Sequence, residues 1–508
     1  MYIVPPELHL GCYMSLHSLI VLLLLPLLGA SIILFLPKDK IALIRNTAIL
    51  FSTITLFFTL YLIIWGNVIP TADGLWLSFV HTWHSRLGTS FSLGVDGFSY
   101  PMVILTALLV WIAILASASI KKQPKGYYLL ILVLEVAVLG VFMARDWGLF
   151  YVFWEATLIP LFFLIDRWGG KDRQTASLNF FLYTMAGSVF MLLSLLFLFD
   201  ITPAHSFAFS DIAAGAAQLS ANEQAWIFLG LLLGFGVKMP IFPLHGWLPL
   251  ADVEAPDPVS ILLSGILQKM GAYGLILSIS ILPKAAVLFQ TPLMILGLIA
   301  IIYGALLAWR QSDMKRMIAY SSIGHMGVVL LGISTLTVTG MTGAVYQMFA
   351  HGLVAAALFM FITFLYQRTG SRNINDYGSL LKVSPHFAFF IAIAFIADTG
   401  LPGSAGFIAE LYVMIGSFET WGGVVAFLSL GVLISATYGI RTVKRLLTEP
   451  SKPITEKMED LKPVEILAAG VLTTGIVIFG FYPAPFLDLI TPSVNHFIDV
   501  ITPPALAR

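Results

Sequence analysis

The sequence predicts an all-α polytopic membrane protein with fourteen transmembrane helices. Of its 508 residues, 58% are hydrophobic and only 11% are charged, whereas a soluble domain is about 45–50% apolar and about 25% charged. An aqueous globule could not bury this much apolar surface. A further observation is a succession of apolar segments, each close to the ~20 residues that a helix needs to cross the hydrocarbon core.

The predicted spans are separated by short polar or charged loops. They are residues 14–37, 44–66, 97–120, 127–144, 147–165, 177–200, 225–248, 258–282, 291–309, 316–337, 340–366, 384–415, 424–446 and 463–488. The first apolar run follows no basic residue and contains no small-residue cleavage site, so we expect no removable signal peptide.

The basic residues predict the orientation. With the N-terminus outside, twenty-one of the 27 lysines and arginines fall in loops on the inner side. Four fall on the outer side, namely Arg86, Arg145, Lys284 and Arg508. This is the asymmetry of the positive-inside rule, and a miscounted span would have scrambled it. We therefore expect both termini on the outer side.

The two remaining lysines lie within spans. Lys238 is about halfway along its span and is followed by Pro240 and Pro243, each of which interrupts helical hydrogen bonding. Lys269 lies in the next span. A mid-bilayer lysine costs roughly 2.5–3.5 kcal/mol on insertion scales, and broken backbone at this depth requires surrounding protein or a watery cavity. Together they indicate a hydrated ion site.

Acids and histidines extend this set. Glu155 and Glu410 lie within further spans, His245 lies beyond the first break, and His325 and His351 lie in two more spans. Alternating groups that bind and release protons are typical of a proton relay, since burial favours a neutral lysine and a nearby carboxylate favours its charged form. Each histidine alone could equally join two helices, and a buried glutamate and lysine could form a purely structural ion pair.

Five motifs surround these residues. They are Phe153-Trp-Glu155, Val237-Lys-Met-Pro-Ile-Phe-Pro-Leu-His-Gly-Trp-Leu-Pro249, Gly265-Ile-Leu-Gln-Lys-Met-Gly-Ala-Tyr-Gly274, Lys315-Arg-Met-Ile-Ala-Tyr-Ser-Ser-Ile-Gly-His-Met-Gly327 and Met348-Phe-Ala-His-Gly352. They resemble the antiporter-like subunits of respiratory complex I, and among these the subunit M type. The resemblance covers roughly residues 90–450.

The resemblance implies a topology of fourteen helices with two inverted five-helix repeats and discontinuous helices near Pro240 and Pro402. It divides this chain into residues 1–126 (helices 1–3), 127–282 (first repeat), 283–446 (second repeat) and 447–508 (an inner loop and helix 14).

The resemblance also implies roles for individual residues. The catalytic set consists of Glu155 paired with Lys238, Lys269 at the centre, His325 and His351 in a hydrated relay, and Glu410 as the terminal acid. His245, Glu135 and Asp398 are candidates for an auxiliary proton path. For Glu135, a structural hydrogen bond is an equal alternative.

The loop after Pro249 departs from the family pattern. Family members usually continue Asp-Ala-His and later Ala-Pro-Thr, whereas this chain has Leu250-Ala-Asp252 and Ala255-Pro-Asp257. The loop thus loses a histidine and gains acids at a helix edge, which leaves the details of proton uptake or coupling open.

The expected function is proton translocation in the membrane arm of a complex I-type NAD(P)H or ferredoxin:quinone oxidoreductase. A single cysteine, Cys12, excludes a disulfide framework, a multi-cysteine zinc site and an iron–sulfur cluster in this chain. Quinone, FMN and iron–sulfur clusters are therefore expected only in partner subunits. The expected partners are other antiporter-like and quinone-site subunits and lipids, in a bacterial inner membrane or a thylakoid membrane. The zero net charge argues against nucleic acid.

Other readings stay open at this point. A multisubunit cation/proton antiporter shares the lysine and glutamate motifs, and hydrogenase and carbon-uptake complexes reuse the same module. A pore or scaffold would explain the helices but not Lys238 and Lys269. Copurified subunits would discriminate among these functions.

Overall fold

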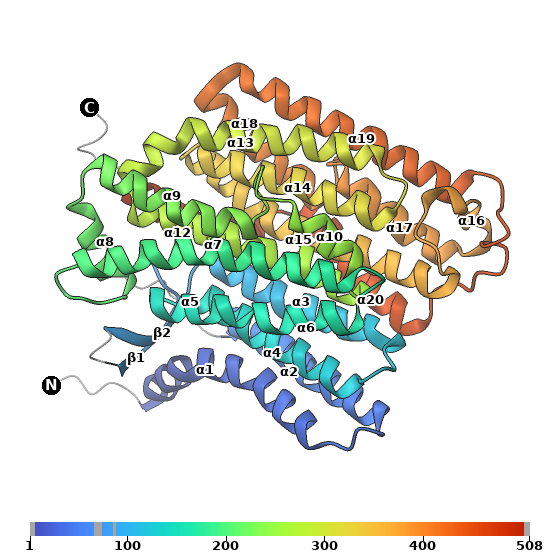
Figure 1. Cartoon of the computed structure of the whole chain (residues 1–508), viewed down its shortest axis with the longest axis horizontal. Coiled ribbons are helices and arrows are strands. Elements are labelled where there is room, and N and C mark those ends of the chain that lie inside the picture. The colour runs from blue at the N-terminus through green and yellow to red at the C-terminus, as the bar shows by residue number, and fades with distance from the viewer. Residues whose placement is uncertain (1–5, 66–73, 85–87, 502–508) are drawn as a thin grey trace.

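The computed structural model describes residues 6–65, 74–84 and 88–501. Its helices lie side by side along a common direction, so the connecting loops collect at the two ends of the bundle (Figure 1). Two of the four basic residues predicted on the outer side, Arg86 and Arg508, lie outside the described residues.

The N-terminal part combines three helices with a β-hairpin. Its elements are α1 (Pro6–Phe35), α2 (Ile41–Trp65), β1 (Leu77–His84), β2 (Thr89–Val95) and α3 (Ser99–Ala116), and the two strands pair antiparallel. The all-helical prediction missed this hairpin. Phe91, Leu93 and Val95 alternate with small residues along β2, which is the two-residue period of a half-buried strand.

The next part carries the first lysine and the first break. Its helices are α4 (Pro124–Met143), α5 (Trp147–Ala156), α6 (Leu158–Trp168), α7 (Arg173–Ile201), α8 (Phe209–Ala217), α9 (Ala221–Lys238), α10 (Trp247–Glu254), α11 (Asp257–Leu262) and α12 (Gln268–Ile281). A π-helical segment, η3 (Leu263–Leu267), joins α11 to α12.

The last part carries the histidines and the second break. Its helices are α13 (Pro283–Arg310), α14 (Met314–Ser334), α15 (Val338–Thr369), α16 (Leu380–Val383), α17 (Pro385–Asp398), α18 (Ala405–Trp421), α19 (Val425–Thr448), α20 (Pro463–Phe481) and α21 (Ala484–Ile501). The last span ends at Phe481 rather than at residue 488, because Pro483 disfavours helical backbone at the residue before it.

Twelve helical stretches among the described residues are long and apolar enough to cross a membrane. The predicted span 225–248 is not one of them, because α9 stops at Lys238. The predicted span 384–415 is divided, since α17 has only 14 residues and α18 runs on into α19 as one stretch, Ala405–Thr448. The chain is therefore a polytopic membrane protein, and the count of fourteen remains a prediction.

The helices are interrupted at the two places where the prolines predicted breaks. After α9 ends at Lys238, the next helix begins only at Trp247. In the turn between α17 and α18, Gly400 and Gly403 adopt φ angles of +67° and +96°, which glycine tolerates without a steric cost. Both turns thus place non-helical backbone within segments that the sequence predicts as single spans.

Two stretches lie at the centre of the bundle. The apolar windows of Asp257–Ile281 and of α15 are completely buried, and α15 packs against α3, α14, α17 and α18. Polar groups within these windows reach neither solvent nor lipid, and burial without a partner is costly. Their contacts therefore carry functional information.

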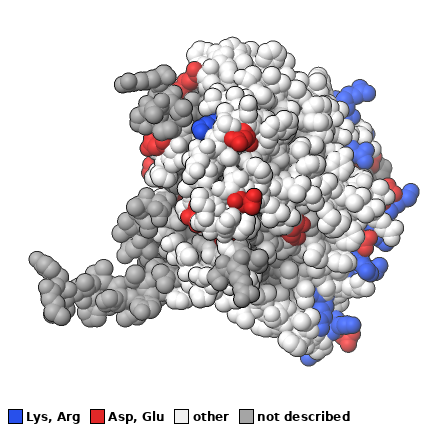
Figure 2. Space-filling model, turned by 60° about the vertical axis from the view of Figure 1, so that its left-hand side comes forward, with Lys and Arg blue, Asp and Glu red and all other residues white. Residues whose placement is uncertain are grey.

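The surface is electrically asymmetric. Lys and Arg gather along the right-hand edge in Figure 2, whereas most of the few charged residues on the face turned forward are acidic. This distribution fits the alternation of basic loops in the sequence.

Candidate functional site

A protonatable contact lies at the centre of the bundle. Lys269 Nζ on α12 lies 2.8 Å from His351 Nδ1 on α15 and also donates to the carbonyl oxygen of Ser264. His351 Nε2 lies 3.2 Å from Ser322 Oγ on α14. Lys269 is 0% exposed and His351 is 3% exposed. Three helices thus meet around one lysine–histidine pair.

A second histidine continues this contact toward two carboxylates. The ring centroids of His351 and His325 are 5.0 Å apart. His325 Nε2 lies 3.3 Å from Asp398 Oδ1, and its Nδ1 lies 3.6 Å from Glu410 Oε1. Gln347 Nε2 is 3.1 Å from the same Nδ1. The acids on the two sides of the α17–α18 turn therefore flank one imidazole.

A small cavity adjoins this imidazole. Its volume of about 20 Å³ exceeds the roughly 10–15 Å³ that one water requires, and its lining includes His325 and Glu410. Ser321 Oγ donates to Asp398 Oδ2 at 2.9 Å and accepts from Tyr438 Oη at 2.7 Å. The cavity therefore has the polar walls that an ordered water needs.

A buried acid lies on the other side of the central lysine. Asp252 on α10 is 0% exposed, and its Oδ2 accepts from Ser264 Oγ at 2.6 Å. Its Oδ1 has no hydrogen-bond partner among the described residues. Ser264 lies in the π-helical segment, a distortion that is frequent at functional sites. Through its hydroxyl and its carbonyl, this serine links Asp252 to Lys269.

The lysine at the first break has different partners. Lys238 is 1% exposed and donates to Thr157 Oγ1 at 3.0 Å. Its Nζ lies 5.1 Å from the ring centroid of Trp154, which is a cation–π distance. No ion pair within 4 Å joins it to Glu155, whose Oε1 has no partner among the described residues. The hydrogen-bond partner of Lys238 is thus Thr157, in the interruption between α5 and α6, whereas the resemblance implied Glu155.

The hairpin fixes the helix that carries this glutamate. Asp146 caps the N-terminus of α5 by accepting from Leu149 N at 3.0 Å, and its other oxygen accepts from Ser90 N of β2 at 2.9 Å. Arg145 pairs with Asp96 at 2.9 Å just beyond β2. These bonds set the depth of α5 in the bundle.

Two predicted auxiliary residues lie apart from the central contacts. His245 Nε2 lies 3.3 Å from Tyr303 Oη, and its ring stacks on Phe242. Glu135 is 0% exposed, and neither carboxylate oxygen has a partner among the described residues. The structural hydrogen bond that was the alternative role for Glu135 is therefore absent among the described residues. Asp398, by contrast, contacts His325 in the central cluster of side chains.

Sequence reasoning missed the uncharged members of the site. Thr157, Ser264, Ser322 and Gln347 supply the hydrogen bonds around the lysines and histidines. Only one weak signal was present. Gln347 precedes His351 by one helical turn, so both lie on the same face of α15.

The arrangement is suited to stepwise proton transfer. Lysine, imidazole and carboxylate groups within or near hydrogen-bond reach can pass a proton between them. Among the side chains in the described parts of the chain, no group of three or more His, Cys, Asp and Glu is placed to hold a metal ion.

Comparisons with known proteins place the chain in a family. Residues 144–435 match a family described as "NADH:quinone oxidoreductase/Mrp antiporter, TM". This region includes Asp252, Lys269, His325 and Glu410. The chain is 36% identical over 465 residues to NADH-quinone oxidoreductase subunit M of Rickettsia conorii, covering 91% of this chain and 93% of the relative. It is 39% identical over 474 residues to NAD(P)H-quinone oxidoreductase chain 4 1 of Picosynechococcus, covering 90% and 87%.

Solved structures show the same fold. A chain of the respiratory complex I from Thermus thermophilus with bound NADH superposes with a TM-score of 0.87 at 29% identity, covering 95% of this chain and 100% of that one. A chain of the Mrp complex from Dietzia has a TM-score of 0.82 at 18% identity, covering 96% and 98%, and shows the fold alone.

Proposed function

Because this chain belongs to the family of membrane subunits of NADH:quinone oxidoreductases and Mrp antiporters, we propose that it moves protons across the membrane through its own buried relay. Its function is that of an antiporter-like subunit in the membrane arm of a complex I-type, proton-translocating quinone oxidoreductase. The observation that supports the relay most is the contact between Lys269 and His351 inside fully buried helices.

The proposed path begins at Asp252 and ends at Glu410. We propose that a proton from the inner side reaches Asp252 and passes from its carboxyl group to the amine of Lys269 through a bridging water. Ser264 positions the two groups, since its hydroxyl donates to Asp252 and its carbonyl oxygen accepts from Lys269. Lys269 then protonates His351 across the 2.8 Å contact. Each of these transfers joins groups on different helices, so small helix movements can open or close the path.

His325 forms the second half of the path. Its imidazole receives the proton from the neighbouring His351, and the two flanking carboxylates stabilise the imidazolium that forms. Transfer to Glu410 places the proton beside the small cavity that His325 and Glu410 line. Release from there leads toward the outer side in the predicted orientation.

Lys238 acts on this path through charge rather than contact. The backbones of α9 and α12 approach closely beside the two lysines, since a Cβ on Gly271 would lie 2.6 Å from Met239 N. A charged Lys238 disfavours a second charge on Lys269. If the ammonium group of Lys238 moved between Thr157 and Glu155, its distance from Lys269 would change. Lys269 would then gain or lose its proton.

The finer assignments rest on the family. We propose fourteen spans in two inverted five-helix repeats, both termini on the outer side, and a bacterial inner membrane or a thylakoid membrane as the location. Quinone, FMN and iron–sulfur clusters belong to the partner subunits, which include further antiporter-like subunits and a quinone-site subunit.

Asp252 offers a test of the uptake step. Asp252→Asn keeps the shape of the side chain but cannot carry a proton, so we expect roughly tenfold slower pumping, less than the ~100-fold low end for a lost proton-transfer group. Asp252→His places the residue usual in the family at this position, and pumping should be largely retained. The measurement is acidification of vesicles that contain the assembled complex. Wild-type pumping by Asp252→Asn would remove this residue from the path, and Asp211→Asn on α8 is the matched control.

The partners can be tested by purification. A mild-detergent isolation of the complex through a tag on this chain should bring down iron–sulfur and quinone-site subunits, identified by mass spectrometry. A preparation that contains only antiporter subunits, without any redox subunit, would instead support the cation/proton antiporter function.

A further inference from the structure

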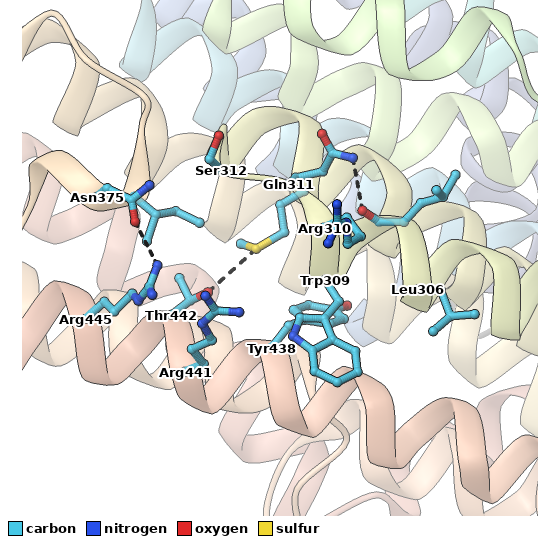
Figure 3. Close-up of a pocket in the computed structure, with 13 residues that line it drawn as sticks. Leu306, Trp309, Arg310, Gln311, Ser312, Asn375, Tyr438, Arg441, Thr442 and Arg445 are labelled. Atoms are coloured by element: carbon cyan, nitrogen blue, oxygen red, sulfur yellow. Dashed lines mark hydrogen bonds between the residues drawn. The ribbon is translucent and has the colours of Figure 1, made fainter.

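A basic pocket lies at the end of α13 and α19 that is predicted to face the inner side. Its volume is about 770 Å³. Arg310 enters it from α13, and Arg441 and Arg445 enter it from α19 (Figure 3). Trp309 forms part of the wall and is 41% exposed. The pocket thus opens on the outside of the bundle.

Two of the three arginines are unpaired. Arg445 donates to Asn375 Oδ1 at 2.7 Å and lies 3.7 Å from Glu449. Arg310 and Arg441, by contrast, form no ion pair or side-chain hydrogen bond with any residue that the structure describes. Their free guanidinium groups make the pocket a site for an anion, because guanidinium binds phosphate oxygens through two parallel bonds.

An apolar groove continues from the same pocket along the helices. Its volume is about 480 Å³, and it shares Leu306 with the basic pocket. The groove is lined by Ile295, Leu298, Ile299, Ile302, Tyr303 and Phe427. At 1.5 Å per residue, the distance along α13 from Leu306 to Ile295 is about 16 Å, which accommodates most of an extended acyl chain.

We propose that this composite site binds one anionic phospholipid of the inner leaflet. The phosphate contacts Arg310 and Arg441, and one acyl chain lies in the groove that ends near Ile295 and Phe427. Basic pockets between transmembrane helices on the inner side bind such headgroups, and Trp309 is of the residue type that is enriched at the membrane–water interface. The site shares Tyr438 with the cavity beside His325, but its arginines take no part in the proposed proton path.

Two other ligands of this site, a free phosphate and an acidic protein segment, would each fill only the basic pocket and not the apolar groove. A free phosphate would occupy the basic pocket but leave the groove open to zwitterionic lipid. An acidic segment of a neighbouring subunit would pair with the arginines but would not place a long apolar chain along α13. The continuity of pocket and groove favours one molecule with an anionic head and an apolar tail.

The test uses the intact complex in vesicles with a phosphatidylglycerol that carries a photoactivatable group near the end of one acyl chain. We expect cross-links to peptides that contain Ile295–Ile302 or Phe427 of this chain, and few with the matching phosphatidylcholine probe. Each arginine near an anionic lipid contributes on the order of fivefold in binding. The double variant Arg310→Gln/Arg441→Gln should therefore lower the phosphatidylglycerol cross-links by roughly 25-fold.

The double variant Arg316→Gln/Lys444→Gln is the matched control. It removes the same charge from the same end of the molecule, but neither residue lines the pocket, so cross-linking should be nearly unchanged. Equal labelling by the two lipids, or labelling that resists Arg310→Gln/Arg441→Gln, would overturn the proposal. Equal labelling by the phosphatidylglycerol and phosphatidylcholine probes once millimolar inorganic phosphate is added would identify a soluble anion in the basic pocket instead.

Discussion

Replacement of Lys269 by alanine is expected to reduce proton pumping by the assembled complex by roughly 100-fold, at the low end of what proton-transfer groups contribute. The reason is its position. Lys269 is the only lysine among the described residues that contacts a histidine of the relay, and its Nζ joins Ser264 on one side to His351 on the other. Without the amine, a proton at Asp252 has no neighbour that can receive it.

Lys269→Arg separates proton transfer from charge. An arginine keeps the positive charge but stays protonated at any accessible pH, so a relay fails with it while a structural cation would be preserved. We therefore expect Lys269→Arg to pump as poorly as Lys269→Ala. Lys284→Ala, which removes an outer-end lysine bonded to the carbonyl oxygens of Ala217 and Leu219, should pump almost normally. Assembly of each variant is checked by native gel electrophoresis before pumping is measured.

Glu410 gives the second large effect. We expect Glu410→Ala and Glu410→Gln to lose at least roughly tenfold in pumping, because neither side chain can take a proton from His325. Glu410→Lys should retain part of the activity, since lysine can also bind and release a proton, and Asp398 remains 3.3 Å from His325 to balance the added charge. The measurement is the initial rate of vesicle acidification for the three variants side by side.

A structural role for Glu410 predicts the opposite rank order. Its carboxylate lies against the turn between α17 and α18, where a Cβ on Gly400 would meet Glu410 Oε2. If the carboxylate only anchored this turn by its packing and polar contacts, Gln would replace it well and Lys poorly. A rank of Gln above Lys would therefore remove Glu410 from the relay.

The ionisable part of the central site was predictable because charge is rare in apolar spans. Lys269, His325, His351, Asp398 and Glu410 each stood out in the sequence for this reason, and the structure brings all five into one continuous cluster. No sequence spacing specified which of them touch, since the contacts join helices far apart in the chain.

The hydrogen-bonding groups between the charges were not predictable. Serine, threonine and glutamine occur in many membrane helices, so Thr157 and Ser264 carried no distinctive signal. The π-helical turn that positions Ser264 depends on packing around α11 and α12, and it has no sequence pattern. The contact of Lys238 with Thr157 instead of Glu155 follows from the interruption between α5 and α6. Pro160 was the available signal for this interruption, because a proline has no N–H for the carbonyl oxygen of Ala156, where α5 ends.

The sequence predicted where the two helix interruptions lie, but not how many residues each of them takes out of the helices. Proline marked both of them, because it removes a backbone donor. The apolar run 384–415, however, looked like one span, since hydropathy does not register a turn made by Gly400 and Gly403 with left-handed backbone. The hairpin was missed for a related reason, as a search for spans of about 20 residues ignores shorter periodic segments.

The proposed function requires that this subunit conduct protons by its own lysine-centred path. The most direct test is the number of protons moved per quinone reduced, measured in vesicles that contain the assembled complex with Lys269→Ala or with Lys238→Ala in this chain. Pumping should fall strongly in both variants, either as a lower proton-to-quinone ratio or as a joint arrest of pumping and quinone reduction. A normal rate and a normal ratio in both variants would contradict it.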